Sequence, residues 1–362
     1  MPPGARGSVA FGNLTEWLHA RNSGNTVSWL VKQARFGEFT TLSMGTKTWI
    51  LLNSGRVVNE IIAKHASVTH ERPHFPIAGD LVSRKKRLFL QKTDDWKEGR
   101  RFFHQLLLGA SSKEHGQIVE AASVGFLRAY LDHPKAWYAH NYRYAVAIMH
   151  KILTNKPLEK SRAELDDLQR VTSTFLTAIN SSFVEFFLKQ LVSPDSSNFG
   201  DHAEADNPRM TINAWIMACL AHPAVMQKAR AEIEQICGTD AHRLPTLEDM
   251  PSLLYMCAVV KEVLRWLDNK DGRHGVEQNL WQYAFSAGRR SCVGYKLAQK
   301  ELFVAISRLL YCFDFWPAGE FNDMNLGAFN PGEPFPVEAK VRSPAYERLI
   351  RDQEAKYDVW GT

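Results

Sequence analysis

The stretch that decides the fold is Phe285-Ser-Ala-Gly288-Arg-Arg290-Ser-Cys292-Val-Gly294. It runs directly into a segment of helical apolar periodicity, so Cys292 stands at the approach to a helix N-terminus. The helix dipole and the free backbone N–H groups at such an end favour a negatively charged sulfur. Glycine at 288 and 294 removes side chains where the backbone must pass close to a flat partner. We interpret the stretch as a loop that presents a thiolate.

An iron porphyrin is the partner that suits this loop. Cys292 would be the axial iron ligand, Arg290 is placed to pair with a propionate, and Phe285 would pack beside the sulfur and exclude water. The alternative is a buried cysteine in a glycine-containing turn, which a lone Cys-x-Gly would favour. Several specified positions in one short loop, followed by an amphipathic helix, favour the heme site instead.

The other four cysteines form no metal or disulfide pattern. None of the five lies in a Cys-x-x-Cys pair, which a zinc site would need. They fall in helical apolar segments, and we expect them to behave as small buried hydrophobes. These residues are Cys219, Cys237, Cys257 and Cys312.

Composition excludes several other classes of protein. The 362 residues are 45% apolar and 23% charged, which is enough for a globular core. A net charge of +5 does not predict nucleic-acid binding, which needs a dense basic stripe, and we interpret Arg84-Lys85-Lys86-Arg87 as a solvated loop. No apolar run is long enough to cross a bilayer, and Met1-Pro2-Pro3-Gly4 does not open a signal peptide.

Periodicity predicts a mainly helical chain with a small β part. Two β-rich runs around Gly45, over 39–52, predict a hairpin. Helices are expected over 115–132, 137–153, 161–192 and 210–221. Four further helices are expected: one after a cap at Asp94 or Asp95, one from Pro223 to Gly238, one from Pro251 and one after Gly294. A strand is expected over 335–341. The apolar stripes of the last two helices are Leu253, Leu254, Cys257, Val260 and Leu264, and Leu297, Ala298, Leu302, Ala305, Ile306 and Leu309.

At the cysteine loop the sequence resembles the cytochrome P-450 heme-thiolate monooxygenases, in particular the microsomal-type enzymes of fungal secondary metabolism. Glu262-Val-Leu-Arg265 resembles the E-x-x-R element of this family, with two charges on one helix face. Trp96-Lys-Glu-Gly-Arg100 resembles the W-x-x-x-R of its C helix, where both side chains approach a heme propionate. An exposed ion pair and an ordinary amphipathic helix are the alternatives for these short motifs. Weaker resemblances at Pro2-Pro3-Gly4, His222-Pro223 and Phe335 extend the match over nearly the whole chain.

The resemblance implies a single cytochrome P-450 domain over residues 1–362 that binds heme b. The implied activity is hydroxylation of a small hydrophobic substrate with O2 and with electrons from NADPH, delivered by a reductase. Cys292 would ligate the iron, and Asp206 fits the acid of the family's A-G-x-D-T-T motif as a candidate proton relay. The other implied residues are Phe285, Gly288, Arg290, Gly294, Trp96 and Arg100 for cofactor binding, and Glu262 and Arg265 for structure.

Three blocks of the family are expected to be missing, near residues 187, 205 and 266. The F and G helices over the substrate pocket have no room near 187, and the I helix lacks its first half before Asp206. Only a short segment separates Arg265 from the cysteine loop, so the meander and sheet segment is absent. Splicing, gene decay and an incorrect gene model are equally open origins. The alternative function is therefore a truncated, non-catalytic heme-binding or poorly folded remnant.

Basic residues in two elements predict a docking surface for an acidic reductase, with an ordinary solvated face as the alternative. They are Lys97, Arg100, Arg101, Arg289, Lys296 and Lys300. Relatives are held at the cytosolic face of the endoplasmic reticulum by an N-terminal helix. This sequence begins after that anchor, which weakens the expected membrane association and leaves the cytoplasm as the alternative location. No motif specifies the substrate or the regiochemistry.

Overall fold

The computed structural model describes residues 1–23, 26–75, 78–80, 83–109, 112–158, 165, 170, 206–268, 284–320 and 335–356. The chain divides into two compact units, residues 1–71 with 271–292 and residues 72–270 with 293–362. Helices dominate the described part, together with two small antiparallel sheets. This confirms the expectation of a mainly helical fold with a small β part. Only residues 165 and 170 of the helix expected over 161–192 are described, and the join expected near 187 lies outside the described residues.

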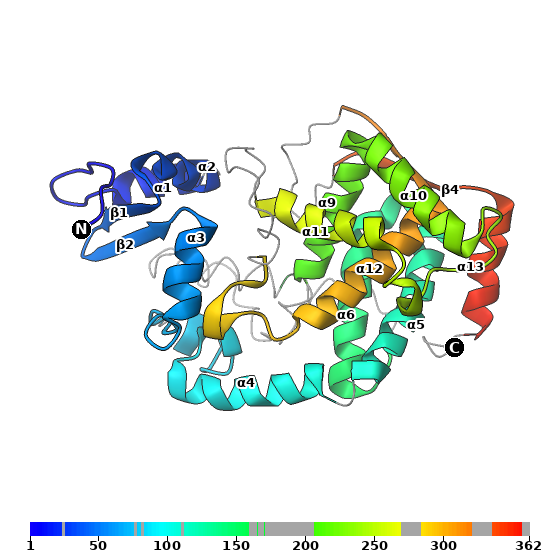
Figure 1. Ribbon diagram of the computed structural model, residues 1–362, viewed down its shortest axis with the longest axis horizontal. Coiled ribbons are helices and arrows are strands. Elements are labelled where there is room, and N and C mark those ends of the chain that lie inside the picture. The colour runs from blue at the N-terminus through cyan, green and yellow to red at the C-terminus, as the bar shows by residue number, and fades with distance from the viewer. Residues whose placement is uncertain are drawn as a thin grey trace. The chain divides into compact units, whose positions relative to one another are not determined.

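The first unit contains the expected hairpin (Figure 1). Strand β1 (Phe39–Met44) pairs antiparallel with β2 (Lys47–Leu52), and Gly45 makes the turn with φ of 63°, a conformation that favours glycine. The helices before the hairpin were not predicted from the sequence. The elements around it are α1 (Leu14–Asn22), α2 (Thr26–Lys32), the 3-10 helix η1 (Gln33–Phe36), α3 (Gly55–Val58) and the π-helix η2 (Asn59–Lys64).

The second unit is a set of packed helices with one small sheet (Figure 1). Its strands β3 (Phe313–Pro317) and β4 (Val337–Val341) pair antiparallel. Its helices are α4 (Thr93–Leu108), α5 (Ser112–Asp132), α6 (Trp137–Thr154), α9 (Asp206–Ala221), α10 (Pro223–Cys237), α11 (Leu254–Asp268), α12 (Tyr295–Cys312) and α13 (Pro344–Lys356). Short 3-10 turns lie at Leu88–Leu90, Pro134–Ala136 and Leu247–Asp249.

Helices α9 and α12 form the core of the second unit. On α9, Ile212, Trp215 and Ile216 are fully buried. Helix α12 packs against α5, α9, α10 and α11, which buries nearly all of its expected apolar stripe. Burial of such aliphatic and aromatic side chains is the main stabilising contribution to the unit.

Helix boundaries follow the expected signals in α10 but not in α4 or α11. Pro223 is the first residue of α10 and Gly238, with φ of 86°, ends it, as expected. Helix α4 begins at Thr93, so Asp94 and Asp95 lie in its first turn, where they face the positive end of the dipole rather than cap it. Helix α11 begins at Leu254 rather than at Pro251. Leu254 is 71% exposed because it shares the outward face of α11 with the exposed Ala258 and Lys261, so its expected place in the buried stripe was wrong.

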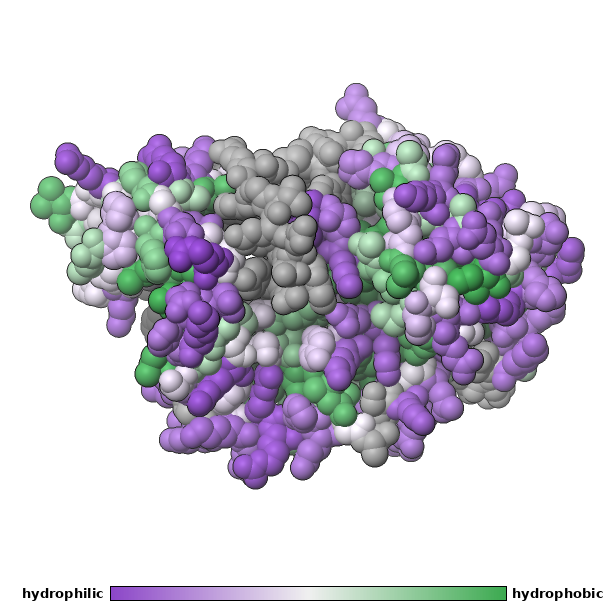
Figure 2. Space-filling model, in the orientation of Figure 1, coloured by the Kyte–Doolittle hydropathy of each residue, from purple (hydrophilic) through white to green (hydrophobic). Residues whose placement is uncertain are grey.

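The surface of α4 is strongly hydrophilic in the view of Figure 2. Its exposed residues include Asp94, Asp95, Lys97, Glu98 and Arg101. Among the described residues, no helix combines the length and the apolar character that a membrane span requires.

Candidate functional site

The cysteine loop lies in the first unit and is closed by its own backbone. The 3-10 helix η9 (Gly288–Arg290) precedes Cys292, and Gly294 is the N-cap of α12. The backbone N–H of Cys292 donates to the carbonyl oxygen of Phe285 at 2.7 Å, and that of Ser291 donates to Gly288 at 3.2 Å. These bonds hold the segment from Phe285 to Cys292 as a compact loop directly before a long helix, as the sequence predicts.

Gly288 is required by a protein contact that the sequence did not reveal. Its φ is 64°, and a Cβ atom there would lie 2.4 Å from the backbone oxygen of Ile62 in η2. Ser286 also has a φ of 64°. A side chain at position 288 would therefore combine an unfavourable left-handed backbone with a direct overlap. The close approach that the sequence suggested for a flat cofactor exists here between two backbone segments.

Arg290 fastens the loop to the segment that follows η2. Its Nε donates to the carbonyl oxygen of His70 at 2.8 Å. This bond fixes the direction of the side chain near its guanidinium group. Pairing of Arg290 with a heme propionate stays a prediction.

Cys292 is the exposed residue among the five cysteines, all of which lie in described residues and form no disulfide. Cys219, Cys237 and Cys312 are buried and Cys257 is half-buried, as expected for small hydrophobes. Burial raises the pKa of Cys237 to about 11 and that of Cys312 to about 12, and it also raises the pKa of Cys219 and of Cys257. An accessible sulfur on a closed loop before a helix is what an axial iron ligand requires. The residues present therefore fit a thiolate-bound heme.

Glu262 and Arg265 form a local ion pair on α11. Arg265 donates from Nε to Glu262 Oε2 at 2.7 Å and from Nη2 to Oε1 at 2.5 Å, and this bonding raises the pKa of Arg265. The Glu262 side chain is 58% exposed and the Arg265 side chain is 27% exposed. Such a surface ion pair contributes only about 0.3–0.5 kcal/mol to the free energy of unfolding. A larger structural role for the pair stays a prediction.

Trp96 and Arg100 share one face of α4 in the second unit. Trp96 is buried, and the guanidinium carbon of Arg100 lies 5.8 Å from the centre of its ring. Stacking of this kind orients a guanidinium group without using all of its donors. The structure thus places the two residues together as the motif requires, while their contact with a propionate stays a prediction.

Asp206 is the first residue of α9, and the structure describes only its backbone. One turn later, the hydroxyl of Thr211 donates to the carbonyl oxygen of Asn207 at 3.1 Å. That hydroxyl therefore serves the helix backbone. A proton-relay role for Asp206 stays a prediction.

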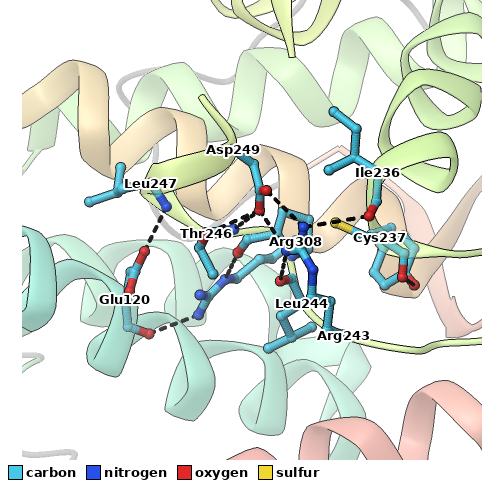
Figure 3. Close-up of polar contacts among 11 residues, drawn as sticks. Glu120, Ile236, Cys237, Arg243, Leu244, Thr246, Leu247, Asp249 and Arg308 are labelled. Carbon is cyan, nitrogen blue, oxygen red and sulfur yellow. Dashed lines mark hydrogen bonds and ion pairs between the residues drawn. The ribbon is translucent and has the colours of Figure 1, made fainter. Parts of the chain in front are cut away.

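Sequence reasoning missed a buried polar cluster that holds α12, the helix that follows Cys292 (Figure 3). Arg308 of α12 is 2% exposed, and its Nε donates to the carbonyl oxygen of Pro245 at 2.8 Å. Its Nη1 donates to Glu120 O at 2.9 Å and to Ser123 Oγ at 2.5 Å, both on α5. The available signal was a charged residue inside an otherwise apolar helical run.

A second part of the cluster fixes the connection between α10 and α11 (Figure 3). Arg243 donates from both terminal nitrogens to Asp249, each at 2.7 Å, and Asp249 also accepts from the N–H of Thr246. The backbone N–H of Leu247 donates to Glu120 Oε1 at 2.6 Å. The connection is thereby tied to α5, and through Arg308 to α12.

The family model "Cytochrome P-450" matches residues 2–206, 203–269 and 265–330. The chain belongs to the cytochrome P-450 family. Its mainly helical architecture with small antiparallel sheets is consistent with that family. The family also implies heme as the cofactor, in agreement with the accessible Cys292.

Similar fungal cytochrome P-450 proteins differ in how much of their length the chain covers. It is 26% identical to a cytochrome P-450 monooxygenase of Armillaria gallica, over 73% of this chain and 61% of the relative. It is 22% identical to cytochrome P-450 monooxygenase fogE of Aspergillus ruber, over 98% of this chain and 89% of the relative. With virE of Hypocrea virens it shares 24% identity over 77% of this chain and 73% of the relative. The chain thus spans less than two thirds of the Armillaria protein.

The cytochrome P-450 match consists of three segments that overlap along the chain. Its three segments meet at 203–206 and at 265–269. The alignment with fogE extends over 487 positions, although this chain has 362 residues. Asp206 lies at the first of these joins, and Arg265 lies at the second.

Proposed function

We propose that this chain binds heme b through Cys292 and acts as a heme-thiolate monooxygenase of fungal secondary metabolism, hydroxylating a small hydrophobic substrate. The observation that carries the proposal is the accessible Cys292 on a loop closed by the Phe285 carbonyl, directly before α12. When bound, heme supplies the activation of O2, assisted by electron donation from its thiolate ligand. NADPH would supply the electrons through a reductase.

The remaining proposed roles follow from what each side chain does in the structure. Arg290 and Arg100 are the cations for the heme propionates, because a hydrogen bond to His70 and stacking on Trp96, respectively, orient them. Phe285 would exclude water beside the sulfur. Asp206 would deliver protons from the start of α9.

We also propose that blocks of the family are absent near 187, 205 and 266. The joins of the family match at 203–206 and 265–269 support the second and third of these positions. A second candidate function follows, in which the chain binds heme without turnover. The observation that favours it is the position of these joins, at the start of α9 and after Arg265, because residues for proton delivery and for the heme-side core lie there in intact relatives.

A carbon monoxide difference spectrum tests the ligation. The chain is expressed with heme available, reduced, and exposed to carbon monoxide. We expect the Soret band of a thiolate-ligated heme in the wild-type chain, and we expect Cys292→Ala to lose it. Cys257→Ala is the matched control, since that half-buried thiol is not proposed to ligate iron. Absence of heme uptake by the folded wild-type chain would reject both candidate functions.

NADPH consumption separates the two candidates once heme is bound. With a reductase and a hydrophobic substrate present, a monooxygenase consumes NADPH and forms hydroxylated product. A heme-binding chain without turnover gives the same Soret band and no product. Location at the cytosolic face of the endoplasmic reticulum is proposed from the family alone, with the cytoplasm as the alternative.

A further inference from the structure

The β1–β2 hairpin of the first unit has one edge that the chain itself occupies. Residues near the N-terminus bond to the outer edge of β1. The backbone N–H of Thr41 donates to the carbonyl oxygen of Pro3 at 2.9 Å, and the N–H of Asn13 donates to that of Ser43 at 2.6 Å. The Ser43 N–H also donates to the side chain of Asn13 at 3.0 Å. Thr41 and Ser43 therefore point their backbone groups outward, and the β1 residues between and beside them point theirs toward β2.

The register of the hairpin leaves the other edge, on β2, open. Leu42, which lies between the two outward residues of β1, pairs with Trp49. Trp49 therefore directs its backbone N–H and C=O toward β1. Because this direction alternates along a strand, Thr48, Ile50 and Leu52 direct theirs away from the hairpin. In the part of the chain that the structure describes, no hydrogen bond engages these outward groups, and the sheet contains only β1 and β2.

The open edge of β2 also lacks the features that usually protect such an edge. Charged residues, proline and bulges normally keep an exposed edge strand from pairing with another chain. Lys47, beside the turn, is the only charged residue of β2, and residues 48–52 include neither proline nor glycine. Trp49 and Ile50 are 38% and 53% exposed, and aromatic and β-branched residues favour extended pairing. The edge is therefore suited to the addition of a further strand.

A second copy of β2 satisfies this edge in full. Two antiparallel β2 strands related by a twofold axis at Ile50 place Ile50 opposite Ile50, and Thr48 opposite Leu52. In this register each outward N–H of one strand meets an outward C=O of the other. Lys47 comes to lie opposite Asn53 of the second copy, so the two positive charges stand at opposite ends of the pair. The facing Ile50 side chains add an apolar cross-strand contact.

We propose that this chain associates with a second copy of itself through the open edge of β2. The dimer is symmetric, and its sheet continues across the two copies in the order β1-β2-β2-β1. One short strand from each copy buries less than the roughly 1,000 Å² of a stable complex, so the dimer is weak and forms reversibly with concentration. The edge includes no residue of the cysteine loop and does not depend on heme.

Sedimentation velocity of the full-length chain over a wide range of concentrations tests this proposal. We expect a monomer–dimer equilibrium in the wild type. Ile50→Lys should weaken dimerisation by about tenfold or more, because it places two like charges opposite each other. Position 50 is exposed, so the folded monomer accommodates lysine there. Val68→Lys, at a 77% exposed residue of the same unit outside β2, is the matched control and should dimerise like the wild type.

A mixing experiment tests the register of the pair. Ile50→Glu alone should dimerise as poorly as Ile50→Lys, whereas an equal mixture of the two variants should restore dimers, because residue 50 of one copy then meets an opposite charge. Circular dichroism checks that each variant folds, and Cys292→Ala should dimerise like the wild type. A mixture that stays monomeric would overturn the proposal. So would a wild type that stays monomeric at every concentration, which would leave the edge to an extended segment of this chain or of another protein.

Discussion

Cys292 and Gly288 show how single residues in one loop serve different purposes. Cys292 offers an accessible sulfur, whereas burial raises the pKa of the other four thiols. Gly288 offers no chemistry and allows the loop to pass against the Ile62 carbonyl of η2. The thiol therefore depends on a glycine that holds its loop against the rest of the first unit.

Replacing Gly288 by alanine should destabilise the first unit more than the same change at Gly45. Both glycines have nearly the same φ, 64° and 63°, but a Cβ at 288 meets the Ile62 oxygen at 2.4 Å, whereas one at 45 meets only a Leu14 methyl at 3.5 Å. The backbone cost of about 1–2 kcal/mol is common to both, and overpacking adds about 1–3 kcal/mol at 288 only. Urea unfolding of the two variants measures the difference. Equal free energies of unfolding would contradict the overlap with Ile62.

Glu301 should make the second unit less stable as the pH rises from about 4.5 to about 8. This carboxyl is buried on α12, its Oε1 has no hydrogen-bond partner in the described residues, and burial raises its pKa from 4.5 to about 8. In that window the unfolded chain loses the proton while the folded chain keeps it. Stability therefore falls by about 1.4 kcal/mol for each pH unit.

Glu301→Gln tests this pH dependence. The amide cannot ionise, so the slope attributable to residue 301 should vanish, and the variant should be more stable than the wild type at pH 8. Urea unfolding at several pH values supplies the comparison. Glu114→Gln is the control, since Glu114 is exposed at the start of α5. An unchanged slope in Glu301→Gln would show that this carboxyl is not the source.

At the scale of elements, α12 is held by polar contacts as well as by apolar packing. Arg308 connects it to α5 and to the segment between α10 and α11, and Arg243 and Asp249 brace that segment (Figure 3). Glu232 of α10 adds a connection by accepting from the N–H groups of Tyr255 and Met256 at 2.9 and 2.8 Å, in the first turn of α11. These carboxylate and guanidinium groups satisfy backbone groups that are buried or at helix ends.

Arg308→Met should destabilise the second unit by about 3–5 kcal/mol. The change leaves the carbonyls of Pro245 and Glu120 without the buried donor that now satisfies them. Arg351→Met on α13 is the control, because Arg351 is exposed and its pair with Glu347 follows the helix surface. That control should change stability by less than about 0.5 kcal/mol. Thermal unfolding measures the stability of both variants. Similar losses of stability in the two would contradict a stabilising role of the Arg308 cluster.

At the scale of the whole molecule, exposed cations recur in two segments, α4 and the cysteine loop with the start of α12. Lys97 and Arg101 are exposed on α4, Lys296 is exposed at the start of α12, and Arg289 is exposed in the cysteine loop. Complementary charge mainly raises the rate at which two proteins meet. The set is therefore proposed to receive an acidic reductase.

Charge reversal at Lys97 and Lys296 should slow reduction of the heme-loaded chain at low ionic strength. Salt screens the attraction, so the difference from the wild type should disappear near 1 M salt. Stopped-flow reduction by an NADPH-dependent reductase provides the rates. Lys228→Glu on α10 carries the same charge change at another exposed lysine, and its heme should be reduced at the wild-type rate. If the heme of Lys97→Glu and of Lys296→Glu is also reduced at the wild-type rate, the surface is an ordinary solvated face.

The sequence by itself determined the features whose causes are local. Turn chemistry predicted the hairpin at Gly45, the Pro223 and Gly238 boundaries of α10, and a loop directly before α12. Backbone preferences and apolar periodicity operate over a few neighbouring residues, so they can be deduced without knowing the fold.

Only the tertiary structure decided which residues meet across long sequence separations. It placed Gly288 against Ile62, joined Arg308 to Glu120 and Pro245, and left the outer edge of β2 without a strand partner among the described residues. It also left Leu254 exposed although its spacing matched the buried stripe. Burial, desolvation and hydrogen-bond satisfaction depend on what packs against each side chain, and the spacing of residues along one element does not contain that information.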